Sequence, residues 1–244
     1  DFKGYISDLG GPSANMYRMG GKDLSICEKC KKPSCIYPKI CNNLNTDHSA
    51  LLDMYRTIDT MSGIKKSFIG SGIRYDMLLH KSEDEQTNKA AKNYIEELIT
   101  HHVSGRLKVA PEHTSDNVLR IMRKPSFNQF FQFKKIFDSI NKQYHLNQQL
   151  IPYFISSHPG CTLSDMAELA IIIKNLNLKP EQVQDFTPSP MTLATEIYYT
   201  GYHPYTLEPI YSAKTKEEKN AQHQFFFWYQ PSNKPTIIAE LKRI

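Results

Sequence analysis

Short runs of β-branched and aromatic residues recur along the chain, and each ends near glycine, proline or serine. Such runs are typical of β-strands that are closed by turns. We expect five strands, near residues 4–7, 66–70, 107–110, 150–155 and 182–186. Apolar residues at helical spacing follow each run, and this alternation favours parallel strands with helices outside them. The expected fold class is therefore α/β, as a closed or partial barrel or a doubly wound sheet.

Helical spacing of apolar residues continues between the strands. The expected helices cover residues 49–61, 86–102, 115–123, 127–144 and 163–176, and a further helix begins near residue 215. Asp47 is a candidate N-cap of the first helix, and Gly63 would end it. Thr162 and Asp165 have the spacing of a capping box at the start of the fifth. Residues 196–244 are expected to form an aromatic loop and then a helix that packs on the rest of the domain.

The interval between the first two strands is about 20 residues longer than one strand-and-helix unit of about 40 residues. The excess contains "CEKCKKPSCIYPKIC" at residues 27–41, so we interpret residues 22–47 as a cysteine-rich insertion. Four thiolates in so short a stretch suit tetrahedral Zn²⁺ or a [4Fe–4S] cluster, and their spacing does not separate the two. The alternative is free or disulfide-bonded cysteines. The candidate metal ligands are Cys27, Cys30, Cys35 and Cys41.

Polar residues and turn formers gather in the loops that follow the predicted strands. These loops read "SDLGGPSAN", "GSGIRYD", "APEHTSD", "SSHPGCT" and "TPSPMT". In parallel α/β folds, ligands bind at the carboxyl ends of strands, so five such loops indicate a ligand lined by backbone and short polar groups.

The first of these loops contains a Gly-Gly-Pro turn, whose backbone amides could receive a carboxylate, a phosphate or an amino-acid head group. The candidates there are Gly10, Gly11, Pro12 and Asn15. A Gly-Gly-Pro turn is by itself a weak signal.

Charged or titratable residues also follow the later strands. Arg74 could pair with a ligand carboxylate or with its neighbour Asp76. Glu112 and His113 could hold an ammonium group or a ribose, move protons, or simply cap the next helix. His158 is equally ambiguous, whereas Cys161 is typical of a small buried residue.

Composition narrows the function classes. With 244 residues and 40% hydrophobic content the chain can bury a core, and its net charge of +5 is spread, which allows but does not require a nucleic-acid partner. There is no run of about 18 apolar residues, so we expect no membrane span. Five cysteines, most of them clustered, favour a reducing compartment and a cytoplasmic protein. No P-loop, Gly-x-Ser-x-Gly elbow or His-Glu-x-x-His motif is present, which argues against those hydrolases.

Several stretches together resemble the YgiQ family of radical S-adenosylmethionine proteins. They are "DFKGYISDLGGPSANMY", "CEKCKKPSCIYPKIC", "GSGIRYD", "THHVSGRLKVAPEHTSDNVLRIMRKP", "LIPYFISSHPGC" and "QVQDFTPSPMTLATEIYYTG". The resemblance covers nearly the whole chain. It implies a partial (β/α) TIM-like barrel over residues 1–244, which binds S-adenosylmethionine and a [4Fe–4S] cluster at its C-terminal rim. The substrate of the family is unassigned.

The resemblance also implies what each strand-end loop does. Gly10, Gly11 and Pro12 match the turn that receives the methionine amino group. Ser71, Arg74, Glu112 and His113 lie where ribose and carboxylate contacts occur in such enzymes. These assignments rest on position alone.

One departure affects the activity that we expect. The Cys-x-x-x-Cys-x-x-Cys cluster motif is absent from this sequence and would lie upstream of Asp1. We therefore expect a fragment of a longer protein, in which the intact enzyme cleaves S-adenosylmethionine reductively to a 5′-deoxyadenosyl radical and the fragment alone is inactive. An edge strand near residues 4–7, left open by truncation, would invite association. The alternative hypothesis is a non-catalytic metal-knuckle module that binds RNA or a protein partner.

Overall fold

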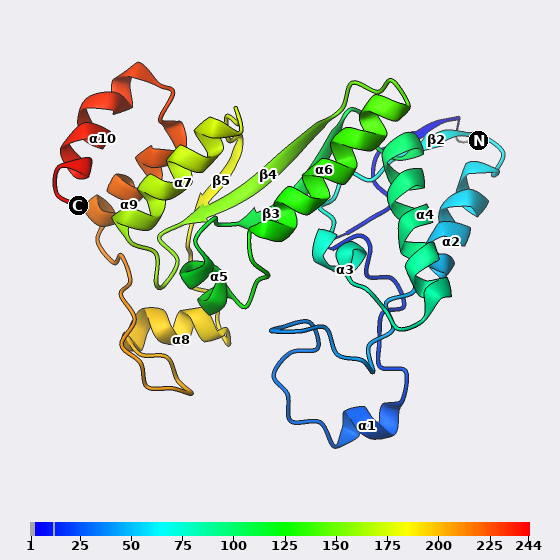
Figure 1. Ribbon diagram of the computed structural model, residues 1–244, viewed down its shortest axis with the longest axis horizontal. Helices are drawn as coiled ribbons and strands as arrows, with labels where there is room; N and C mark the ends of the chain where they lie inside the picture. The colour runs from blue at the N-terminus through cyan, green and yellow to red at the C-terminus, as the bar shows by residue number, and fades with distance from the viewer. Residues whose placement is uncertain (1–2, 12) are drawn as a thin grey trace. The chain divides into compact units, whose positions relative to one another are not determined.

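The computed structural model of the chain describes all residues except 1, 2 and 12 (Figure 1). The chain divides into two compact units. Unit 1 consists of Asp1–Ala110 and Asn128–Ile151, and unit 2 consists of Pro111–Phe127 and Pro152–Ile244. The predicted site residue Pro12 lies outside the described residues.

Strands and helices alternate along the chain, as the hydrophobic pattern predicts. The strands are β1 (Gly4–Ile6), β2 (Ile64–Ser67), β3 (Arg106–Glu112), β4 (Gln149–Ser156) and β5 (Gln182–Asp185). The helices of unit 1 are α1 (Leu24–Glu28), α2 (Ser49–Asp59), α3 (Tyr75–Leu79), α4 (Glu85–His101) and α6 (Asn128–Gln143). Those of unit 2 are α5 (Asp116–Met122), α7 (Leu163–Asn175), α8 (Leu193–Thr200), α9 (Lys216–His223) and α10 (Lys234–Leu241), with the 3₁₀ turns η1 (Gln224–Phe227) and η2 (Pro231–Asn233).

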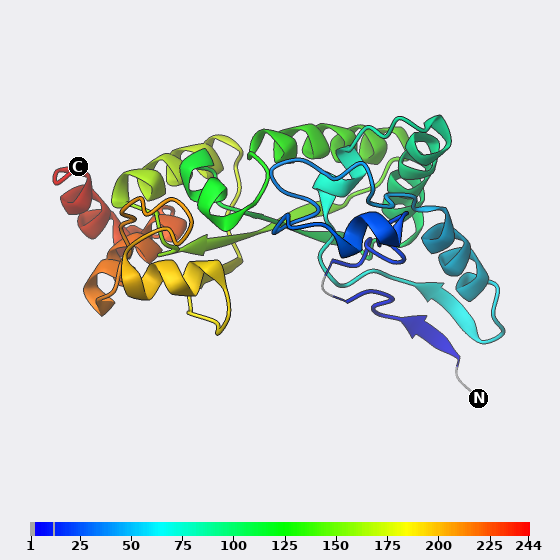
Figure 2. The ribbon, with the colours of Figure 1, turned by 90° about the horizontal axis from the view of Figure 1, so that it is seen from below.

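The strands form two sheets, β1–β2 and β3–β4–β5. The β1–β2 and β4–β5 pairs are parallel, and Figure 2 shows β1 and β2 side by side. An isolated parallel bridge pairs Ile73, in the segment after β2, with Val109 of β3. The expected α/β class is confirmed. Within the described residues no barrel is closed, so the partial barrel stays a prediction.

Unit 1 builds its core from the apolar faces of α2, α4 and α6. Each face repeats at helical spacing, because residues three and four apart lie on one side of a helix. Tyr55 of α2 and Tyr94 of α4 are both fully buried, and their hydroxyls lie 3.3 Å apart, so each polar group has a partner. Phe130, Phe133 and Phe137 form the buried stripe of α6. The neighbouring apolar side chains are only half-buried, namely Phe131, Ile136 and Ile140.

Unit 2 is stabilised by close contacts around α5, α7 and α8. Ile121, Ile197 and Ile210 form one buried cluster. Gly160, in the loop before α7, has φ +85°, and its N–H donates to the carbonyl of Tyr211 at 2.7 Å. The aromatic rings of Phe154 and Phe226 stack with centroids 6.4 Å apart, which fixes η1 on β4.

Helix ends follow local signals with a few corrections. The capping box of Thr162 and Asp165 is present at the start of α7, as expected. Helix α2 begins at Ser49, as expected, so its N-cap is the preceding residue His48 and not Asp47; the Asp47 carboxylate still accepts a hydrogen bond from the N–H of Ser49 at 2.9 Å. Residues 193–200, part of which was expected to be an aromatic loop, form α8, which ends at the left-handed Gly201.

The cysteine-rich insertion is closed at its base by short backbone contacts. Gly21 and Leu44 form an antiparallel bridge, and the N–H of Lys22 donates to the carbonyl of Asn43 at 2.7 Å. The short helix α1 has no buried residue, which explains why no apolar pattern predicts it.

Candidate functional site

Unit 2 contains a pocket of about 300 Å³ at the carboxyl ends of its strands. The last residue of β3 and the ends of β4 and β5 contribute to its lining, together with the loop that follows β5. This is the edge where parallel α/β folds bind ligands. The volume is at the lower end of the range of about 300 to 1,000 Å³ for small-molecule sites.

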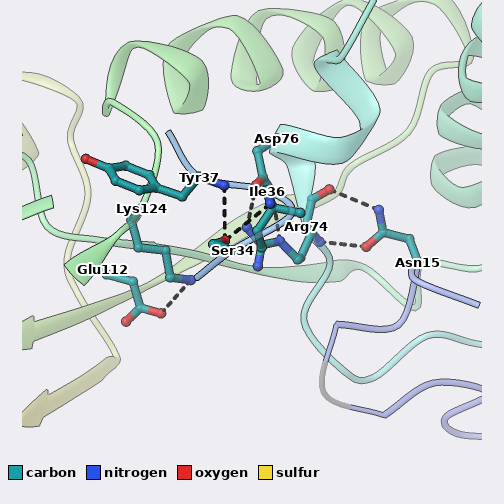
Figure 3. Close-up of polar contacts among 8 residues, drawn as sticks. All are labelled: Asn15, Ser34, Ile36, Tyr37, Arg74, Asp76, Glu112 and Lys124. Atoms are coloured by element: carbon teal, nitrogen blue, oxygen red, sulfur yellow. Dashed lines mark hydrogen bonds and ion pairs between the residues drawn. The ribbon is translucent and has the colours of Figure 1, made fainter. Parts of the chain in front are cut away.

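Glu112 is the most unusual residue of this pocket. It ends β3 with φ +66°, a left-handed conformation that is unfavourable for a non-glycine residue by about 1–2 kcal/mol. Its side chain is 13% exposed, and one carboxylate oxygen, Oε1, lies 3.1 Å from Nζ of Lys124 (Figure 3). The other oxygen, Oε2, is buried without a hydrogen-bond partner among the described residues. One carboxylate oxygen of Glu112 therefore has no donor among the described residues.

Lys124 reaches Glu112 because α5 ends sharply. Arg123, the C-cap residue, adopts a left-handed conformation with φ +55°, and the N–H of Lys124 donates to the carbonyl of Leu119 at 2.9 Å. This turn reverses the chain, as left-handed C-caps do. It places the lysine beside the end of β3.

His158 lies in the pocket lining as a neutral imidazole. It is 5% exposed, and burial lowers its pKa to about 4. Its Nδ1 lies 2.9 Å from the carbonyl oxygen of Pro159, which can only accept, so Nδ1 carries the proton and Nε2 is left as an acceptor. Phe186 contacts the imidazole edge to face, with ring centres 5.0 Å apart.

Asp185 at the end of β5 brings a second carboxylate to the pocket, which the sequence did not identify. Its Oδ1 accepts hydrogen bonds from Ser156 at 2.5 Å and from Nδ1 of His223 at 2.8 Å. Burial acts to raise the pKa of Asp185, but these hydrogen bonds and the nearby charges of His223 and Lys219 outweigh it and lower the pKa. Asp185 is therefore ionised at neutral pH.

His113 and Cys161 form a separate buried pair in unit 2. Both side chains are fully buried, and Nε2 of His113 lies 3.4 Å from the Cys161 sulfur. Nδ1 of His113 accepts from the N–H of Ser115 at 3.0 Å, at the start of α5. Burial lowers the pKa of His113 to about 4 and raises that of the Cys161 thiol. Both ring nitrogens of His113 have partners, which agrees with the helix-capping alternative.

In unit 1, the loops after β1 and β2 are joined by one carboxylate that the sequence pattern did not single out. Asp8 accepts hydrogen bonds from the N–H groups of Gly10 at 2.8 Å and Gly70 at 3.1 Å, and from the Ser71 hydroxyl. Although burial acts to raise the pKa of Asp8, the hydrogen bonds lower it. A Cβ on Gly10 would lie 2.6 Å from Cβ of Ala14, so this position requires glycine. The signal was present in the sequence, since an aspartate two residues before Gly-Gly is typical of an Asx turn.

Asn15 and Arg74 also form an internal pair in unit 1. The fully buried Asn15 amide accepts from the N–H of Arg74 at 2.7 Å and donates to its carbonyl at 2.9 Å (Figure 3). The Arg74 guanidinium pairs with Asp76, the local partner that the sequence offers as an alternative to a ligand. Around Gly11, by contrast, a Cβ would meet none of the described residues within 4 Å.

The cysteines of the insertion are all free. Cys27, Cys30 and Cys35 are exposed and Cys41 is half-buried. Two sulfurs accept hydrogen bonds, Cys27 from the Asn43 amide at 3.2 Å and Cys30 from the backbone at 3.4 Å. In the part of the chain that the structure describes, no three His, Cys, Asp or Glu side chains are grouped to hold a metal ion. Zinc or an iron–sulfur cluster at these four residues stays a prediction. None of the described helices is long and apolar enough to cross a bilayer.

Comparison with known proteins finds similar sequences over the whole chain. The chain is 68% identical over 244 residues to a UPF0313 protein of Bacteroides thetaiotaomicron, a match that covers 100% of the chain and 39% of that protein. It is 66% identical to a UPF0313 protein of Porphyromonas gingivalis, and 45% identical over 233 residues to one of Methanocella arvoryzae. Residues 181–244 match a family model described as a domain of unknown function, DUF3362.

These matches cover all or nearly all of this chain but only part of each relative. The chain spans 39%, 38% and 37% of the length of the three proteins. It is therefore similar, from end to end, to a segment of UPF0313 proteins.

Proposed function

We propose that this chain is the segment of a UPF0313 radical S-adenosylmethionine protein that binds the cofactor, and that the pocket of unit 2 holds it. The motif resemblance to radical S-adenosylmethionine proteins and the match to UPF0313 proteins over the whole chain support this proposal. The substrate of the intact enzyme stays unassigned.

The observation that carries the proposal is the state of Glu112. An unfavourable backbone conformation and a buried, unpaired carboxylate oxygen both lower stability, and such features persist where they serve a site. A ribose diol or an ammonium group would donate to Oε2 and satisfy it. Both groups belong to S-adenosylmethionine.

The other residues of the pocket fit the cofactor by their chemistry. Lys124, at the same edge, would attract the methionine carboxylate. Phe186 and Ile155 provide apolar surface for the flat adenine ring. Neutral His158 offers an acceptor for an amino or hydroxyl group. The chain's own task would be to bind and orient the cofactor and to exclude water; when bound, S-adenosylmethionine supplies the radical chemistry.

The predicted contacts of unit 1 have a different role in this proposal. The polar groups of Gly10, Asn15, Ser71 and Arg74 already have partners within unit 1. We therefore assign them to the shape of the loops after β1 and β2, and their direct contact with the cofactor stays a prediction.

Binding of S-adenosylmethionine to the 244-residue chain, measured by isothermal titration calorimetry, tests the site. Replacing Glu112 by Gln should weaken binding about tenfold or more, because hydrogen bonds to a charged group contribute about 1.5–3 kcal/mol. Glu217→Gln removes the same charge from an exposed position at the start of α9 and should leave binding unchanged. Equal affinity of all three proteins would place the cofactor elsewhere.

The reaction itself is tested in a full-length protein. Anaerobic reconstitution of a full-length relative with iron and sulfide should give a protein that converts S-adenosylmethionine to 5′-deoxyadenosine under reducing conditions. A fully metal-loaded protein that does not form 5′-deoxyadenosine would refute the proposed radical S-adenosylmethionine activity.

A further inference from the structure

The two carboxylates of the pocket differ in how their charge is compensated. Glu112 has the ammonium group of Lys124 at 3.1 Å, so the pair presents little net charge to a ligand. Asp185 is paired with a histidine, which is charged only when protonated, and with the hydroxyl of Ser156. With His158 neutral, the lining of the pocket carries two negative charges and one positive charge. Asp185 is thus the lining carboxylate without a lysine or arginine ion pair, although the charges of His223 and Lys219 act on it from nearby.

The hydrogen bonds of Asp185 involve only one of its two carboxylate oxygens. Both hydrogen bonds to Asp185 fall on Oδ1, and among the described residues no group donates to Oδ2. His223 is itself held by the rings of Phe226 and Phe227, at 5.7 and 5.4 Å between ring centres. Lys219, the other nearby cation, places Nζ 5.2 Å from the ring centre of Tyr198. The side chain of Asp185 is 36% exposed, so Oδ2 is open to a ligand.

We propose that Asp185 determines the specificity of this pocket by recognising a positive charge on the ligand. This inference rests on the proposed function and deepens it: Glu112 binds groups that S-adenosylmethionine and S-adenosylhomocysteine share, whereas Asp185 distinguishes the sulfonium cation from the neutral thioether. A compensated ion pair has the field of a dipole, which decreases faster with distance than that of a single charge. Asp185 can therefore interact electrostatically with a positive charge on the ligand sulfur without direct contact.

The two ligands form a matched pair for the test, because they differ by one methyl group and one positive charge. Their dissociation constants are measured by calorimetry in the same buffer for every variant. The wild-type chain should prefer S-adenosylmethionine about tenfold, which corresponds to about 1.4 kcal/mol. Asp185→Asn, which keeps an oxygen to accept from Ser156 and His223, should bring the ratio close to one while retaining S-adenosylhomocysteine.

Two control variants separate the roles of the carboxylates. Glu112→Gln should weaken both ligands in parallel and leave the ratio unchanged, and Glu217→Gln should change neither value. High salt should reduce the preference of the wild-type chain, because screening acts on the charge and not on the shared groups.

The outcomes distinguish this inference from the proposed function. If the wild-type chain binds neither ligand, the proposed cofactor site is wrong. If it binds both equally, or if Asp185→Asn keeps the preference, only the role of Asp185 is overturned. An Asp185→Asn variant that binds neither ligand would show that the carboxylate supports the whole pocket, which also overturns a role in specificity.

Discussion

Gly160 offers the sharpest test of the packing that supports the pocket. It precedes α7 in the loop that contains His158, and its φ of +85° lies in the region that disfavours residues with a Cβ. A Cβ at this position would lie 2.2 Å from Cδ1 of Ile121, which is 5% exposed. The change Gly160→Ala therefore adds strain to the backbone and a clash to the core.

The two contributions can be estimated separately. The left-handed conformation should destabilise alanine by about 1–2 kcal/mol relative to glycine, and overpacking should add about 1–3 kcal/mol. Gly160→Ala should thus lower the free energy of unfolding by about 2–5 kcal/mol. Gly201→Ala is the matched control, because Gly201 has φ +78° but a Cβ there would meet none of the described residues within 4 Å. Gly201→Ala should therefore lower the free energy of unfolding by the backbone contribution alone, about 1–2 kcal/mol.

A double-mutant cycle in urea denaturation isolates the clash. Ile121→Val removes the Cδ1 atom that the new methyl group would meet, and alone it should be unfavourable by about 0.5–1.5 kcal/mol. Combined with Gly160→Ala it should recover at least about 1 kcal/mol, so the two changes should couple favourably. Additive effects of the two substitutions, or equal losses for Gly160→Ala and Gly201→Ala, would refute the steric argument.

Three further predictions concern other parts of the chain. Asn15→Ala leaves the backbone N–H and carbonyl of Arg74 without their partner and should lower the free energy of unfolding by about 2–4 kcal/mol in urea titrations; an unchanged midpoint would contradict this role. The pKa of His158 is lowered from 6.5 to about 4 in the folded chain, so the unfolded chain takes up the proton first as pH falls. The free energy of unfolding should decrease between about pH 6.5 and about pH 4, by up to about 1.4 kcal/mol per pH unit from this group. His158→Asn should make the slope of the free energy of unfolding against pH shallower, and an equal slope in both proteins would contradict the assignment. Elemental analysis of chain purified under reducing conditions should find about one zinc ion or one iron cluster, lost on joint replacement of Cys30 and Cys35 by Ser; freshly purified protein without metal would refute the metal site.

Local patterns predicted most of the secondary structure because the interactions that form it are local. The expected strands agree with β1 to β5 to within a few residues at each end, and the capping box of Thr162 and Asp165 forms as its spacing predicts. Two missed helices had different reasons: α3 buries Tyr75, Met77 and Leu78 but is only five residues long, too short to show a helical repeat, whereas α1 lacks an apolar pattern. Helix α1 buries no residue, so its position in the insertion depends on the chain around it.

The candidate site was only partly predictable. Glu112 was identified because it directly follows a strand, but its partner Lys124 depends on the reversal of the chain after α5. Asp185 was missed because its partner His223 lies 38 residues away in the sequence, where no local pattern connects the two. In unit 1 a predicted ligand contact has an internal partner instead. The sequence suggested that the Asn15 amide binds a ligand, but in the structure this amide bonds to the backbone of Arg74, 59 residues further along the chain.

By itself the sequence determined the α/β alternation and the strand ends at which polar residues gather, because each depends on neighbours within a few positions. The tertiary structure decided which of those polar groups pair with each other and which have no partner among the described residues. Strand pairing and helix packing bring together residues that no local pattern connects. For that reason Oε2 of Glu112 and Oδ2 of Asp185 accept no hydrogen bond among the described residues, and both carboxylates line the pocket of unit 2.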